Sequence, residues 1–335
     1  MSEEEKIEAS PKAKAKTKTE AIITPKDIKR VWDEIYSEIR RVIIGKVDVL
    51  EDMFIALLAG GHCLLEGVPG IAKTIMAKTF ASTLGCEFKR VQFTPDLLPS
   101  DVVGTTIYDP KAGTFKMRKG PIFTNILLAD EINRSPPKTQ AALLEAMAEK
   151  QVTVEGTTFK LDDPFLVIAT QNPIEQEGTY PLPEAQVDRF MFKLLVGLPT
   201  PEEEMEIIKL KHKQIRQTVR RVTTPMTINK MKETVETKIY VHEDIMEYIK
   251  EIVVTTRTDP RLLLGGSPRC SIALLTAGKA VAAMRGRDYV IPDDVKRVAR
   301  VATAHRLAMK PEAELEGTTG TIIVGEILRN QPVPV

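Results

Sequence analysis

The feature that most constrains the fold of this chain is one eight-residue segment, Gly67-Val68-Pro69-Gly70-Ile71-Ala72-Lys73-Thr74. It follows a short apolar run, His62–Glu66, that is typical of a buried strand, and it leads into the helical segment Thr74–Leu84. A glycine-containing loop between a strand and a helix is the context of a phosphate-binding loop (P-loop), in which backbone N–H groups and the positive end of the helix hold phosphate oxygens. The segment therefore predicts a nucleotide site.

Two residues at the end of this P-loop carry its chemistry. We expect the ammonium of Lys73 to reach the β- and γ-phosphates of ATP and the hydroxyl of Thr74 to bind Mg²⁺. The usual spacing puts glycine before the lysine; here the residue is Ala72, whose Cβ is tolerable if its φ is negative. A chance surface turn is the alternative, and the strand before and the helix after argue against it.

A second motif, Ile126–Glu131, is an apolar run that ends in two acids. We expect Asp130 to hold Mg²⁺, directly or through water, and Glu131 to orient and deprotonate the attacking water. A strand that simply ends in polar surface residues is the alternative. The P-loop upstream favours the catalytic interpretation, so the pair predicts hydrolysis of the nucleotide as well as binding.

Apolar runs that alternate with helical segments predict an α/β fold with a parallel sheet and helices on both faces. Besides His62–Glu66, the expected buried strands are Phe88–Phe93, Ile126–Ala129, Phe165–Thr170 and Phe190–Val196. Turn signals predict two inserted β-hairpins, over 103–119 and 151–161. Helical spacing predicts helices over 27–41 and Val49–Ala59.

The character of the chain changes near residue 200. Helical periods then dominate, over 202–219, 228–237, 242–256, 268–284 and 292–306, and Thr321–Leu328 is expected to be a strand or a short helix. Residues 1–26 have the composition of a disordered tail. The expected organisation is a tail (1–26), an α/β nucleotide-binding core (27–199) and an all-helical lid domain (200–335).

The overall composition limits the classes of partner. Lys and Arg number 47 against 46 Asp and Glu, so no whole-protein field draws the chain onto nucleic acid or anionic lipid. Three cysteines without a CxxC pair fit a reducing compartment. The charged N-terminus lacks the apolar region of a signal peptide, and the apolar stretches are far shorter than the roughly 20 residues that span a bilayer, so we expect no signal peptide and a cytoplasmic protein.

Together the motifs resemble those of the MoxR family of AAA+ ATPases, over about residues 27–335. The matching stretches are Gly67–Thr74, Leu127–Pro136, Ala169–Pro173, Leu182–Phe190 and Gly265–Arg269. Ala72 is itself the residue that MoxR proteins tend to carry. The resemblance implies an AAA+ P-loop core with the β-hairpin inserts of the helix-2-insert, chelatase-like branch. It also implies ATP hydrolysis with Mg²⁺ and a homo-oligomeric ring, as a hexamer.

The resemblance assigns roles to two residues that the sequence alone leaves open. It implies that Asn172 is sensor 1, beside the attacking water or the γ-phosphate, whereas a plain Asn-Pro turn is an equal alternative. It implies that Arg189 is an arginine finger that reaches the nucleotide of the neighbouring subunit. A surface ion pair of Arg189 with Asp188 or Glu184 is the simpler interpretation of the sequence by itself.

Two further sites follow from the resemblance. Arg269, in the first turn of a lid helix, is implied to be sensor 2, aimed back at the nucleotide; an ordinary exposed arginine is the alternative. Ile43, Ile44 and Gly45 resemble the segment that packs around the adenine base. A plain helix end capped by Gly45 is compatible with the same residues.

In function, the resemblance implies an ATP-driven, chaperone-like remodeller or metal-cofactor-insertion factor, with partners that contain a von Willebrand factor A domain. The alternative is a DNA-interacting, helicase-like motor, against which the balanced charge and the 5% of aromatic residues argue. The first hairpin alternates Phe115 and Met117 with Lys116 and Arg118. A solvated hairpin is the plain interpretation of this pattern, and a loop that grips a client is the sharper one.

Overall fold

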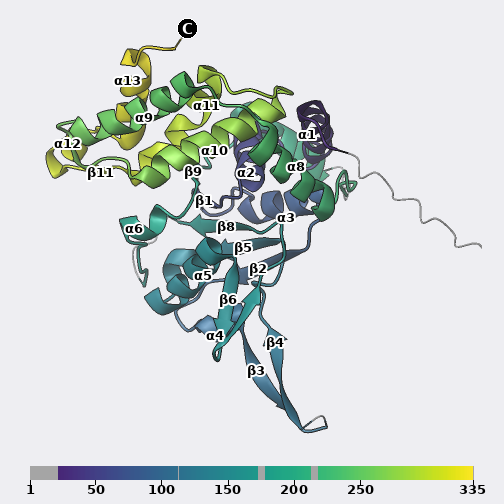
Figure 1. Cartoon of the computed structure of the whole chain (residues 1–335). Helices are drawn as coiled ribbons and strands as arrows, with labels where there is room; N and C mark the ends of the chain where they lie inside the picture. Colours follow the sequence, from purple (N-terminus) through teal and green to yellow (C-terminus); the bar gives the residue numbers. More distant parts are fainter. Residues whose placement is uncertain (1–21, 112, 173–177, 213–217, 335) are drawn as a thin grey trace, which may run out of the picture.

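The computed structural model describes residues 22–111, 113–172, 178–212 and 218–334. At its centre lies a five-stranded sheet in the order β2-β5-β8-β1-β9, with every neighbouring pair parallel (Figure 1). The strands are β1 (Cys63–Glu66), β2 (Phe88–Gln92), β5 (Ile126–Asp130), β8 (Leu166–Gln171) and β9 (Phe192–Leu195). The predicted parallel α/β sheet is confirmed, and β8 lies between the P-loop strand β1 and the strand β5 that leads to the two acids.

Side chains alternate between the two faces of this sheet, and each face packs into its own apolar cluster. On β5, Ile126 and Leu128 join one cluster while Leu127 and Ala129 join the other. The first cluster contains α1 (Pro25–Ile39), α2 (Val47–Leu58) and α3 (Lys73–Leu84), and the second contains α4 (Pro99–Val103) and α5 (Pro137–Glu149). Because both faces are covered, the central strands are apolar up to the polar residues near their carboxyl ends.

Strand β2 differs from the central strands because it lies at the edge of the sheet. Most of its residues are half-buried, so the expectation of a buried strand over Phe88–Phe93 is wrong for most of that run. The edge position leaves room for the polar side chains of Lys89, Arg90 and Gln92. Two of these, Arg90 and Gln92, reach the neighbouring strand's acids, as described below.

The chain enters the fold earlier than expected from the sequence. Thr24 caps α1: its Oγ1 accepts a hydrogen bond from the Asp27 N–H, and the Asp27 carboxylate accepts one from the Thr24 N–H. The Ile23 carbonyl accepts a hydrogen bond from the hydroxyl of Thr234. The prediction of a tail as far as residue 26 is therefore wrong for its last residues, and residues 1–21 lie outside the described part of the chain.

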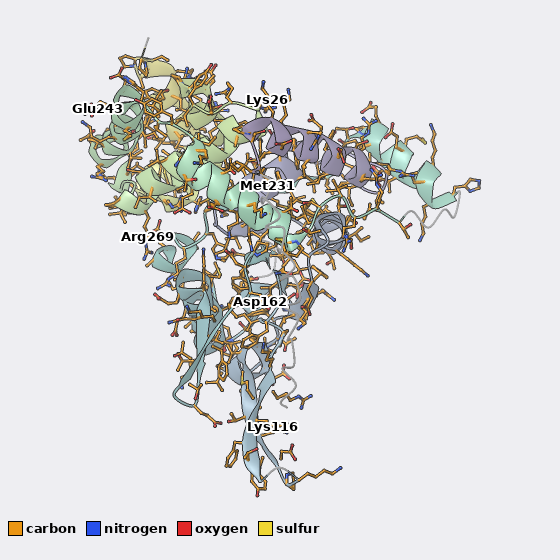
Figure 2. The ribbon with its side chains drawn as sticks, turned by 45° about the vertical axis from the view of Figure 1, so that its right-hand side comes forward. Lys26, Lys116, Asp162, Met231, Glu243 and Arg269 are labelled. Atoms are coloured by element: carbon orange, nitrogen blue, oxygen red, sulfur yellow. The ribbon has the colours of Figure 1, made fainter. Side chains whose placement is uncertain are left out.

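Both predicted β-hairpins are present. The larger one, β3 (Gly104–Asp109) with β4 (Thr114–Lys119), projects away from the sheet, and Figure 2 shows Lys116 near its far end. The smaller one, β6 (Gln151–Val154) with β7 (Thr157–Lys160), has Glu155 in its turn. Thr106 Oγ1 of the larger hairpin donates a hydrogen bond to the Glu155 carboxylate. The two hairpins therefore contact each other, and the outer part of the larger one is exposed.

Beyond residue 200 the chain is mostly helical, as predicted. Its helices are α7 (Pro201–His212), α8 (Pro225–Lys238), α9 (Glu243–Thr258), α10 (Pro268–Met284), α11 (Pro292–Thr303), α12 (Pro311–Leu315) and α13 (Gly320–Asn330). The segment 321–328 is thus helical, whereas Thr218 and Val219, expected at the end of a helix over 202–219, are not. In the described ranges no helix is long and apolar enough to cross a membrane.

The lid is not all-helical, because β10 (Leu262–Leu264) pairs with β11 (Ala308–Met309). It shares the first apolar cluster with the core, since that cluster continues from the sheet through α2 into α8–α11. Arg297 of α11 also donates hydrogen bonds to Asp52 (2.8 Å) and Glu51 (3.2 Å) of α2. Lid and core are therefore closely packed, and the division into 27–199 and 200–335 stays a prediction.

Candidate active site

The P-loop leaves the sheet at the carboxyl end of β1. The N–H of Gly67 donates to the carbonyl of Gln171, at the end of β8, over 3.4 Å. Gly70 has a φ of 85°, and a Cβ there would meet no atom within 4 Å, so the loop is open at this point. Ala72 has a φ of 66°, so the expectation of a negative φ is wrong. An exposed alanine adopts the left-handed conformation at a cost of about 1–2 kcal/mol.

Lys73 lies within electrostatic reach of the two acids. Its Nζ donates a hydrogen bond to the Gly67 carbonyl at 2.5 Å, so the side chain folds back over the loop. Partial burial lowers the pKa of Lys73, and the charges of Asp130, Glu131 and Glu66 act in the opposite direction. The loop thus holds an ammonium near two carboxylates that come from a strand two places away in the sheet.

The carboxylate of Asp130 is buried at the end of β5 and accepts hydrogen bonds on both oxygens. Its Oδ1 accepts from the Thr170 hydroxyl at 2.6 Å. Its Oδ2 accepts from Nε and Nη2 of Arg90, at 3.0 and 2.7 Å. The strands on both sides of β5 therefore orient this carboxylate: β8 through Thr170 and β2 through Arg90.

Glu131 has an unusual backbone conformation, with a φ of 56°. Its N–H donates to Oγ1 of Thr170 at 2.8 Å. Its carboxylate accepts hydrogen bonds from Gln92 Nε2 at 2.6 Å and from Arg134 Nη1 at 3.0 Å. Left-handed conformations are uncommon outside glycine and gather at functional sites, where the surroundings hold them in place.

Asn172 lies on the same side of the sheet as the P-loop and the two acids. We call this side, where the parallel strands reach their carboxyl ends, the P-loop edge. Asn172 directly follows β8, is 4% exposed and stands two residues after Thr170. Because β8 separates β1 from β5, Asn172 is placed between the P-loop and the acids along this edge. The expected position beside the Asp130 strand is confirmed, and its role as sensor 1 stays a prediction. Residue 173, the last of its motif, lies outside the described ranges.

The predicted adenine segment, Ile43, Ile44 and Gly45, lies between α1 and α2. Helix α1 ends at Ile39, so the alternative in which Gly45 caps that helix is wrong. Ile43 is buried in the first apolar cluster. Gly45 has a φ of 66°, and a Cβ there would lie 2.1 Å from Oε1 of Glu203 in α7. The segment therefore packs against the start of the lid, and its contact with the base stays a prediction.

Arg189 and Arg269 lie away from the P-loop edge. Both line a cavity of about 380 Å³ whose walls include Gly61 and His62, at the amino end of β1. Since β1 has four residues, about 13 Å of strand separates this cavity from the P-loop. Figure 2 shows Arg269 where the lid meets the core. An arginine aimed back at the nucleotide would have to lie beside the P-loop of its own chain. The structure places Arg269 elsewhere, so it differs from this expectation.

Asp188 contacts two of the three arginines that line this cavity, Arg269 and Arg306. Its carboxylate accepts a hydrogen bond from Arg306 Nε at 2.8 Å and forms an ion pair with Arg269 at 3.6 Å. Arg189 instead donates from Nη1 to the Leu144 carbonyl of α5 at 3.2 Å. The guanidinium of Arg189 is therefore anchored to the main chain of α5, whereas Asp188 binds the guanidinium groups of Arg269 and Arg306.

The residues at the P-loop edge fit a magnesium nucleotide. The open loop around Gly70 leaves space for phosphates, and Lys73 would supply the positive charge that binds them. The Thr74 hydroxyl and the Asp130 carboxylate are hard oxygen ligands of the kind that Mg²⁺ prefers. When bound, Mg²⁺ neutralises charge that develops on the phosphate oxygens during transfer.

Four polar side chains of this site are not among the site residues predicted from the sequence: Arg90, Gln92, Arg134 and Thr170. For Arg90 and Gln92 a signal existed, because two polar residues at i and i+2 on an expected strand share one face. For Thr170 there was none, since a threonine in an apolar strand is ordinary. Only the register of β5 against β8, with Ala129 opposite Ala169, brings Thr170 to the acids.

Comparison with known families matches two parts of the chain. The family described as "ATPase family associated with various cellular activities (AAA)" matches residues 62–192. The AAA lid domain matches residues 254–327. The first match runs from the start of β1 to the first residue of β9 and includes both hairpins, and the second runs from the end of α9 into α13.

Relatives match nearly the full chain. A protein of Bacillus subtilis called YeaC is 49% identical over 92% of this chain and 97% of its own. A Mycobacterium tuberculosis protein named Chaperone MoxR1 is 43% identical over 89% of this chain and 81% of its own. The crystal structure of a Cytophaga hutchinsonii protein superposes with a TM-score of 0.86, at 43% identity, over 92% of this chain and 96% of the other.

Proposed function

Because the chain belongs to the MoxR family of AAA+ ATPases, we propose that it hydrolyses ATP with Mg²⁺ in order to remodel partner proteins. The observation that carries the proposal is that Lys73 follows β1 while Asp130 and Glu131 come from the same end of the parallel strand β5, so that the charges of both acids act on the Lys73 ammonium. A phosphate-binding cation, a metal-binding acid and a second acid are the parts that hydrolysis needs.

Each residue of this edge has a task in the proposed reaction. The backbone of Gly67–Thr74 cradles the phosphates, and Thr74 and Asp130 hold Mg²⁺, directly or through water. Glu131 accepts a proton from the attacking water as a general base. Asn172 orients that water or the γ-phosphate through its amide. Ile43, Ile44 and Gly45 border the base.

We further propose that the working unit is a homo-oligomeric ring, as a hexamer, in which Arg189 completes the site of a neighbour. The cavity of Arg189 and Arg269 lies at the end of β1 opposite to the P-loop, which supports this arrangement. A head-to-tail ring would bring that end of one subunit against the P-loop edge of the next. Arg269 then faces the neighbour's nucleotide together with Arg189, rather than its own.

For the client contact we propose the outer part of the β3–β4 hairpin. The rings of Tyr108 and Phe115 pair across its strands with centroids 5.3 Å apart, and these residues remain 56% and 73% exposed. Exposed aromatic residues with basic neighbours such as Lys116 and Arg118 are suited to protein contacts. The clients would be cytoplasmic proteins, with von Willebrand factor A domain proteins as partners.

The direct test is phosphate release from ATP by the purified protein. We expect turnover that requires Mg²⁺ and is abolished by chelation with EDTA. Lys73→Ala should lose nucleotide affinity, because the phosphates lose their positive partner. Unchanged ATP binding by Lys73→Ala would rule out the proposed P-loop, and stimulation of turnover by DNA would favour the alternative of a nucleic-acid motor.

A further inference from the structure

One buried hydroxyl contacts both acids of the candidate site. Thr170 of β8 is 1% exposed. Its Oγ1 lies 2.6 Å from Oδ1 of Asp130 and 2.8 Å from the main-chain nitrogen of Glu131. These two acids are consecutive in sequence, so a single atom on the neighbouring strand touches the side chain of one and the backbone of the next.

The chemistry of the two contacts fixes which group donates. A hydroxyl has one proton to give and two lone pairs with which to accept. The Glu131 N–H can only donate, so Thr170 accepts there. An ionised Asp130 carboxylate can only accept, so the hydroxyl proton points to Oδ1. Both contacts are therefore satisfied at once, and the hydroxyl cannot rotate without losing one of them.

The contact to Glu131 acts where the backbone is strained. A φ of 56° costs a residue with a side chain about 1–2 kcal/mol, so an uncommon conformation persists only if its surroundings hold it. The Glu131 side chain has its own partners in Gln92 and Arg134, both of which stand at least partly in solvent. The bond to Thr170 is the buried, main-chain part of this restraint.

We propose that Thr170 is a positioning residue for ATP hydrolysis: its hydroxyl keeps Glu131 in the left-handed conformation and aligns Asp130 with it. This inference rests on the proposed function, and it assigns the positioning of both carboxylates to one buried side chain. Removing the hydroxyl allows Glu131 to relax, so the base turns away while the P-loop remains intact.

The test compares Thr170→Val, which has nearly the same shape without the hydroxyl, with Thr170→Ser, which keeps the hydroxyl. We expect kcat to fall about 10- to 100-fold in Thr170→Val with KM for ATP within about threefold, as for a misplaced catalytic group. Thr170→Ser should recover most of kcat. Thr83→Val is the matched control, because its buried hydroxyl only donates to the Thr79 carbonyl of α3.

Two further measurements separate positioning from loss of fold. In the nucleotide-free protein, amide exchange at Glu131 should accelerate in Thr170→Val and stay slow in Thr170→Ser. Adding Thr170→Val to Glu131→Gln should lower the residual turnover by much less than Thr170→Val lowers that of the wild type, because the base is already absent and only the alignment of Asp130 is left to lose. If Thr170→Val is insoluble, Thr170→Ala replaces it in the same comparisons.

The inference is overturned if Thr170→Val keeps kcat within twofold, if Thr170→Ser loses as much as Thr170→Val, or if the Glu131 amide exchanges equally in all variants. Full additivity with Glu131→Gln would also overturn it. A wild-type protein that does not hydrolyse ATP at all would instead refute the proposed function, and the exchange measurement would still test the hold of Thr170 on Glu131.

Discussion

Arg90 on the edge strand β2 donates two hydrogen bonds, of 3.0 and 2.7 Å, to the same oxygen of Asp130 on β5. Asp130 is the expected magnesium ligand, so this arginine and a bound Mg²⁺ would share one carboxylate. The Arg90 side chain is 46% exposed, and a pair of this kind contributes up to about 1 kcal/mol.

The first prediction concerns competition between Arg90 and Mg²⁺ for the Asp130 carboxylate. Arg90→Gln should lower the Mg²⁺ concentration for half-maximal turnover by up to about fivefold, because a competing positive charge is removed. The same variant should reduce kcat, since Asp130 loses one of its two restraints. A Mg²⁺ titration of turnover measures both effects. A requirement for more Mg²⁺ in Arg90→Gln would show that the arginine supports metal binding instead.

The second prediction concerns the base. Glu131→Gln keeps the shape of the side chain but removes its ability to accept a proton, so kcat should fall about 100-fold or more. The affinity for ATP should stay within about threefold of the wild type, as measured by the binding of a fluorescent ATP analogue. Turnover within tenfold of the wild type would exclude Glu131 as the base.

The elements of this site were predictable from the sequence where the pattern is local. The run before Asp130 is apolar at every position because both faces of β5 are covered, and Gly67–Thr74 carries its own strand and helix context. The contact of Arg90 with Asp130 depends instead on which strand neighbours β5. The position of Arg269 depends on how the lid packs against the core. These relations are set by tertiary register, which a single sequence does not encode locally.

The third prediction concerns the β3–β4 hairpin. Charge reversal of Lys116 and Arg118 should leave basal turnover within about twofold, because the hairpin projects away from the central sheet (Figure 1). Stimulation of turnover by a von Willebrand factor A partner should weaken. Lys160→Glu, on the smaller hairpin, is the control for a change of charge alone. Loss of basal turnover in the charge-reversal variant would show that the larger hairpin is needed for the stability of the fold.

The fourth prediction is a dependence of stability on pH. His62 is 3% exposed; its Nδ1 accepts from the Val167 N–H at 3.0 Å, which leaves Nε2 to donate to the Met147 carbonyl at 3.1 Å. The ring is thus held neutral, and burial lowers its pKa from 6.5 to about 4. The unfolded chain binds more protons between these values, so this contribution to stability is complete above pH 6.5 and is lost as the pH falls towards 4.

The size of this effect can be checked by urea unfolding at a series of pH values. A shift of this size corresponds to about 3 kcal/mol between pH 6.5 and 4. His62→Asn, whose amide oxygen can still accept the Val167 N–H, should show a shallower dependence by roughly that amount, although it is less stable at pH 7. An unchanged slope would mean that other groups, such as the half-buried His305, account for the acid sensitivity.

The central claim is that the nucleotide site is completed by a neighbouring subunit, and mixing two inactive variants tests it most directly. Arg189→Ala retains a P-loop but lacks the finger, whereas Lys73→Ala retains the finger but lacks a working P-loop. Each should be inactive alone. In an equal mixture about one quarter of head-to-tail interfaces would pair an intact P-loop with an intact finger, so turnover should return to about a quarter of the wild-type rate. A mixture as inactive as its components, under conditions where the subunits associate, would contradict the claim.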